Sequence, residues 1–128
     1  MIEKIYHKHT LIAIRYKKFK NDATPLTDPS EPLQVVAFKV RKGKYTKAHI
    51  HTPRKRTTQK LQECLVVVSG KIKIDLYTSG KIYFKSIYLS SGQAVVLVSG
   101  GHAVHVLQDS EIFEIKNGPY LDDKVLIE

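Results

Sequence analysis

Short runs of β-forming residues, separated by turn-forming residues, are the feature that most constrains the fold of this chain. Val, Ile, Tyr and Phe recur in such runs at intervals of roughly ten residues, as they do in β-sandwiches and barrels. Gly, Ser, Asp or Pro stand between most of the runs and favour turns. No stretch of ten or more residues keeps the i, i+3, i+4, i+7 apolar spacing of an amphipathic helix. An all-β fold is therefore predicted, with strands at residues 11–16, 33–40, 63–68, 71–77, 82–89, 94–98, 102–107 and 111–116.

Size and composition narrow the class of protein further. A chain of 128 residues with 42% hydrophobic and 26% charged residues is typical of one globular domain and excludes global disorder. The longest apolar runs, such as residues 64–68, are far shorter than the roughly 20 residues of a membrane-spanning helix. The first ten residues contain no apolar signal core. We expect a cytoplasmic protein with no membrane partner, in which the single Cys64 forms no internal disulfide.

The positive charge is concentrated in one part of the sequence. The formal net charge is +9, and residues 39–60 contain nine basic and no acidic residues. Such an excess favours phosphate-bearing partners, including nucleic acid. Few aromatic residues lie near the cluster (Phe38 and Tyr45), and no recognition helix is expected. We therefore expect a small-molecule anionic ligand and no nucleic acid.

Two histidines inside this basic stretch point to metal chemistry. His49 and His51 have i, i+2 spacing, which on a strand directs both imidazoles to the same face, where they could bind one metal ion. The alternative is a pair of surface histidines on an exposed strand. His7 and His9 have the same spacing, but they lie among charged residues near the N-terminus, and there we keep the surface interpretation.

Two motifs of the chain resemble those of the cupin superfamily. The first runs through Gly43, His49, His51, Glu63 and Gly70, with a longer spacer before the glutamate than is usual in that superfamily. The second runs from residue 92 to 102, ends on His102, and has Val98 where the superfamily has proline.

The resemblance implies a fold and a division of the chain. It predicts a single-domain cupin, a double-stranded β-helix or jelly-roll barrel, over residues 33–120. Residues 1–32 would supply N-terminal strands and a loop packing on this barrel, and residues 121–128 a C-terminal tail. A homodimer is also implied, with an edge strand such as residues 11–16 as one means of association.

The same resemblance implies a metal site. His49, His51, Glu63 and His102 would bind one divalent transition metal, a mixed nitrogen and oxygen donor set that suits Fe, Mn, Ni, Co, Cu or Zn. His105 would point from the opposite face of the strand that holds His102, so we favour His102 as the ligand. The alternative is a barrel with a polar lining and no metal.

A third motif near the C-terminus resembles a narrower group. Glu114, Lys116 and the Gly118-Pro119-Tyr120 sequence resemble the closing ExKxGPY signature of small metal-binding cupins of the WbuC family, found with genes for bacterial surface polysaccharides. Glu114 and Lys116 would share a strand face with Ile112. Facing inward they would form a pocket ion pair and be candidate catalytic residues. Facing outward they would lie on a solvated edge strand.

These observations leave two main functions open. The first is a metal-dependent enzyme, with isomerase-like, epimerase-like or oxygenase-like chemistry, acting on a nucleotide sugar or another small anionic or polyhydroxylated molecule in surface-polysaccharide biosynthesis. Arg54 and Arg56 would bind its phosphate and Tyr120 would contact the substrate, unless the arginines only form a solvated loop. The second is a non-catalytic metal-binding or sugar-binding module.

Overall fold

A computed structural model describes residues 2–127, which form strands, turns and extended segments but no helix. Consequently no helix in that range could cross a membrane. The prediction of an all-β chain is confirmed. The strands are β1 (Ile2–His7), β2 (Thr10–Tyr16), β3 (Asp22–Pro25), β4 (Val36–Lys39), β5 (Glu63–Ser69), β6 (Lys71–Tyr77), β7 (Tyr83–Ser90), β8 (Ala94–Leu97), β9 (Gly101–Val106) and β10 (Glu111–Lys116).

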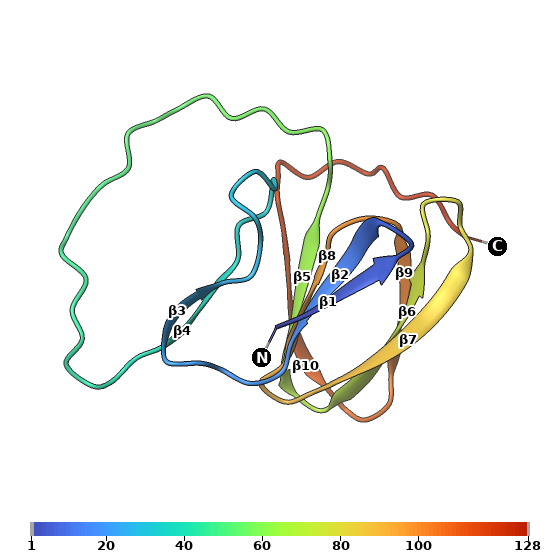
Figure 1. Cartoon of the computed structure of the whole chain (residues 1–128), viewed down its shortest axis with the longest axis horizontal. Helices are drawn as coiled ribbons and strands as arrows, with labels where there is room; N and C mark the ends of the chain where they lie inside the picture. Colours follow the sequence, from blue (N-terminus) through green and yellow to red (C-terminus); the bar gives the residue numbers. More distant parts are fainter. Residues whose placement is uncertain (1, 128) are drawn as a thin grey trace.

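The strands form two main antiparallel sheets and one small one (Figure 1). The five-stranded sheet has the order β1-β2-β8-β5-β10, and the three-stranded sheet has the order β7-β6-β9. The small sheet pairs β3 with β4. Every pairing is antiparallel, and the two main sheets enclose a core as in a β-sandwich or jelly-roll fold.

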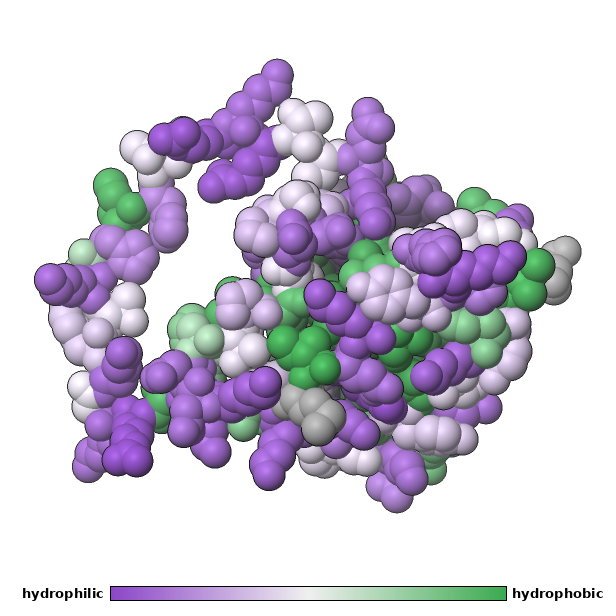
Figure 2. Space-filling view, in the orientation of Figure 1, coloured by the Kyte–Doolittle hydropathy of each residue, from purple (hydrophilic) through white to green (hydrophobic). Residues whose placement is uncertain are grey.

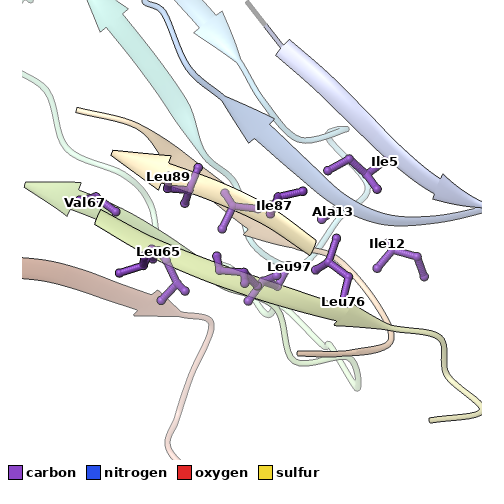
Figure 3. Close-up of a cluster of buried hydrophobic side chains, with 12 residues drawn as sticks. Ile5, Ile12, Ala13, Leu65, Val67, Leu76, Ile87, Leu89 and Leu97 are labelled. Carbon is purple, nitrogen blue, oxygen red and sulfur yellow. The ribbon is translucent and has the colours of Figure 1, made fainter. Parts of the chain in front are cut away.

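Strict alternation along the strands builds this core. In β6, Ile72, Ile74 and Leu76 are fully buried, while the residues between them are partly exposed. Side chains of the five-stranded sheet, such as Val67 and Val95, complete the same cluster, which Figure 3 shows between the strands. Since each buried aliphatic side chain contributes on the order of 2 kcal/mol, this core fixes the register of both sheets.

A second core lies on the other face of the five-stranded sheet. Tyr16, Cys64 and Val96 are buried there against Leu26 and Leu33 from the segment between β2 and β4. Burial raises the pKa of the Cys64 thiol to about 11, so this thiol is an inert core residue.

The N-terminal region is part of the main sheet. β1 extends it through pairing with β2, and β2 pairs in turn with β8. The predicted strand at residues 11–16 is therefore internal, and the suggestion that it forms an edge for dimerisation is wrong. The edge strands of this sheet are β1 and β10. The IEKIYH sequence of β1 has too little alternation to be predicted as a strand.

Residues 40–61, called the basic segment below, form no strand. They connect β4 to β5, and every residue in this range is exposed. Figure 1 shows this segment as a wide arc standing away from the sheets, and Figure 2 shows that its surface is largely hydrophilic. The predicted strand at 33–40 is correspondingly reduced to β4, Val36–Lys39.

Candidate functional site

Glu63 and His102 meet at one end of the sandwich. Glu63 begins β5 in the five-stranded sheet, and His102 lies in β9 of the three-stranded sheet. His102 is paired with the fully buried Leu76, so it points to the inner face. The Nε2 atom of His102 lies 3.5 Å from the Oε2 atom of Glu63, and the two side chains are 28% and 17% exposed.

Lys116 and Glu114 form an ion pair beside these residues. Lys116 is paired with Glu63 in the β5–β10 ladder, and its Nζ atom lies 3.1 Å from the Oε1 atom of Glu114. Ile112, on the same face, packs against the core between the sheets, whereas Phe113 is 65% exposed on the other face. The predicted sharing of a face is confirmed. The ion pair itself is half-exposed, with its lysine and glutamate side chains 36% and 46% exposed. It is therefore neither a buried ion pair inside the pocket nor a fully solvated pair on an edge strand.

The electrostatics of this cluster favour the charged forms of Glu63 and Lys116. The contact with His102 is the main cause that lowers the pKa of Glu63, against the opposing effect of burial, and the Lys116 charge adds to it. The pKa of Lys116 is raised, first by its hydrogen bond with Glu114 and then by the charges of Glu114 and Glu63. Lys116 therefore remains an ammonium ion at neutral pH, a state that suits anion binding or proton donation better than proton abstraction.

A pocket of about 610 Å³ opens on this cluster. Glu63, His102 and Lys116 form part of its wall, and residues 120–127 of the C-terminal segment form another part. A smaller neighbouring pocket of about 280 Å³ lies between residues 58–61 and 116–121. Tyr120 lines both pockets and is 78% exposed. The volumes suit a small molecule.

The other predicted ligands lie elsewhere, on the basic segment. The rings of His49 and His51 have centroids 5.1 Å apart, and the Nδ1 atom of His49 lies 2.7 Å from the backbone oxygen of Lys47. The Nη1 atom of Arg56 donates a hydrogen bond of 3.4 Å to the backbone oxygen of Arg54. Within residues 2–127 the structure contains no group of three or more His, Cys, Asp and Glu side chains that could hold a metal ion. Of the four predicted metal ligands, Glu63 and His102 lie side by side, whereas His49 and His51 lie apart from them.

His105 belongs to a separate pair on the outside of the three-stranded sheet. Its Nε2 atom lies 2.7 Å from Oδ2 of Asp75, and Ser86 donates a hydrogen bond of 2.6 Å to the other oxygen of that aspartate. His105 thus faces away from the pocket that contains His102, as the alternation of strand side chains requires. The partner, Asp75, was not anticipated, although the alternation of β6 places it on this outer face.

Comparison with known proteins identifies no relative of this chain. No protein-family model, no curated protein and no solved structure matches the chain. The fold and site define an antiparallel β protein with a carboxylate–imidazole pair and an adjacent ammonium group in one pocket.

Proposed function

We propose that this protein is a small cytoplasmic cupin, active as a homodimer, whose pocket takes one divalent transition metal and a small anionic or polyhydroxylated molecule. A nucleotide sugar used in surface-polysaccharide biosynthesis is the ligand type that we favour. The convergence of Glu63 and His102, from strands of two different sheets, carries the proposal. A carboxylate oxygen and an imidazole nitrogen are suitable donors for Fe, Mn, Ni, Co, Cu or Zn, and two of the four predicted ligands are thus already adjacent.

The remaining two donors would come from the basic segment. The spacer between His51 and Glu63 contains eleven residues, and an extended chain covers roughly 3.3 Å per residue. The segment is therefore long enough to bring His49 and His51 back over the pocket. Its end is tethered there, because the next strand begins with Glu63 itself.

The edge of β9 offers a place for this segment to dock. β9 is an edge strand of the three-stranded sheet, so one row of its backbone groups has no strand partner. Val104 and Val106 are paired with the fully buried Ile74 and Ile72 but are 42% and 60% exposed. A strand added at this edge would satisfy the backbone groups and cover these valines.

The proposed metal and the side chains around it would each have a distinct role toward the ligand. A metal bound here would supply Lewis acidity toward a carbonyl or hydroxyl oxygen of the ligand. Lys116 would bind an anionic group beside it, with Glu114 and Lys116 as the candidates for proton transfer. Arg54 and Arg56, brought in with the histidines, would bind phosphate, for which the guanidinium geometry is well suited. Tyr120 would contact the ligand from the pocket wall.

One observation favours the second function, a binding or sensing module without turnover. The raised pKa of Lys116 removes it as a general base, which leaves Glu114 as the candidate base of the cluster. Conversion of a nucleotide sugar followed by NMR would establish an enzyme. A thermal shift with the same compound that disappears on chelation, without conversion, would establish a binding module.

Metal content tests the core of the proposal. We expect about one divalent ion per chain after reconstitution, and loss of uptake in His102→Ala and in the double variant His49→Ala/His51→Ala. The matched controls are His105→Ala and the double variant His7→Ala/His9→Ala, which should bind as the unaltered chain does. Less than about 0.1 metal per chain, with no uptake on reconstitution, would contradict the proposal.

A further inference from the structure

Gln62, the residue before Glu63, is a buried polar side chain. Within the described range 2–127, it and Thr27 are the buried residues of polar or charged type, and Gln62 is 0% exposed. A buried amide costs free energy unless its hydrogen-bonding groups are satisfied. The partners of Gln62 therefore show what its position requires.

The side chain of Gln62 joins three parts of the fold. Its Oε1 atom accepts a hydrogen bond of 3.1 Å from the Leu33 backbone. Its Nε2 atom donates to the Glu31 carboxylate at 2.6 Å and to the Val98 carbonyl at 3.3 Å. The start of β5 is thereby fixed to the segment before β4 and to the end of β8.

Asn117 fixes the backbone of the same residue. Its Oδ1 atom accepts a hydrogen bond of 2.8 Å from the Gln62 backbone, and its Nδ2 atom donates to the Lys60 carbonyl at 3.0 Å. The β5–β10 ladder ends at the pair Glu63 and Lys116. The Asn117 side chain therefore supplies the next rung after the last rung of the sheet.

We infer that Gln62 and Asn117 are positioning residues for the site, an inference that rests on the proposed function. Their hydrogen bonds hold Glu63 toward His102 and Lys116 toward the pocket, because both site residues belong to the rung that the bonds secure. The same bonds fix the point from which the basic segment leaves the fold. Groups that orient a metal ligand in this way typically change metal affinity by 10-fold to 100-fold when they are removed.

Asn117→Ala tests the inference. Asn117 is only partly buried, so its truncation opens no core cavity. We expect the Gln62 amide of the metal-free protein to exchange with solvent about tenfold faster, because the rung is lost. We also expect Co²⁺ to bind at least about tenfold more weakly in a spectroscopic titration. The control is Thr27→Val, which removes the oxygen of a buried side chain that accepts a hydrogen bond from the Val35 backbone N–H and should change neither reading.

Asn117→Asp is the second variant. It keeps the oxygen that accepts from Gln62 but lacks the donor to Lys60, so exchange at Gln62 should stay near that of the unaltered chain. The inference is wrong if Asn117→Ala matches Thr27→Val in either reading, or if the Gln62 amide of Asn117→Asp exchanges as fast as that of the alanine variant. Absence of Co²⁺ binding by the unaltered chain would instead contradict the proposed function. The exchange measurements would then test only whether Asn117 secures the Gln62 backbone.

Discussion

The two halves of the proposed metal site are built in opposite ways. Glu63 and His102 lie on strands, with backbone ladders and packed cores that fix where their side chains point. His49 and His51 lie on the exposed basic segment. Donors on strands need no further ordering to bind a metal, whereas ordering a segment costs roughly 1–2 kcal/mol per residue. The strand half would therefore set the position of the metal, and the segment half would make occupancy depend on a folding step.

The first prediction compares a glycine next to the strand half with one on the basic segment, and it concerns the largest expected change in the free energy of unfolding. A β-carbon at Gly100, in the turn that borders the pocket, would overlap the Tyr77 carbonyl oxygen, and the residue has a φ of +74°. Gly43, on the basic segment, has a φ of +92° but no atom within 4 Å of a β-carbon. We expect Gly100→Ala to lower the free energy of unfolding by more than about 3 kcal/mol and Gly43→Ala by about 1 kcal/mol. Equal losses in urea titrations would show that the two regions are equally constrained.

The contrast also explains how much the sequence predicts. The runs of β-forming residues at 71–77 and 111–116 predict β6 and β10 with their observed bounds. In β6 the apolar residues also alternate with polar ones, and the apolar residues are the buried ones. The family resemblance brings Glu63 and His102 into one site, and the structure places them together. Gln62 and Asn117 were not predicted, because a hydrogen bond between residues 55 apart in the chain leaves no local pattern.

The second prediction asks whether metal removes the difference between the halves. Without metal, trypsin should cleave first within Arg54-Lys55-Arg56, since this stretch is exposed and forms no strand. With Zn²⁺ at about one hundred times its dissociation constant, ordering of the segment should slow this cleavage at least tenfold.

Two double variants with identical spacing control the experiment. His49→Ala/His51→Ala should abolish the protection, and His7→Ala/His9→Ala should retain it. Protection that survives loss of residues 49 and 51 would show that other ligands order the segment. Cleavage unaffected by saturating metal would show that the segment takes no part in binding.

The third prediction concerns the pH dependence of stability and involves only Glu63, a residue of the strand half. The pKa of Glu63 is lowered in the folded protein, so its contribution to stability is present above the unfolded value near 4.5 and is lost as the pH falls through the folded value. Glu63→Gln should therefore reduce the free energy of unfolding at pH 7, by only about 0.5 kcal/mol because the group is partly solvated. The difference between variant and unaltered chain should close in acid. Urea titrations of the metal-free proteins at neutral and acidic pH measure it, and a difference that grows in acid would contradict the assignment.

The last prediction uses the outer carboxylate–histidine pair and concerns the smallest effect. Hydrogen bonds from Ser86 and then His105 lower the pKa of Asp75, so the sign of its pH dependence is that of Glu63. The pair lies on the outer face, away from the pocket, and solvent weakens such interactions. Asp75→Asn should therefore lower the melting temperature less than Glu63→Gln does and leave metal uptake unchanged. Loss of uptake in Asp75→Asn would mean that the metal lies on the outer face, with His105 as its ligand in place of His102.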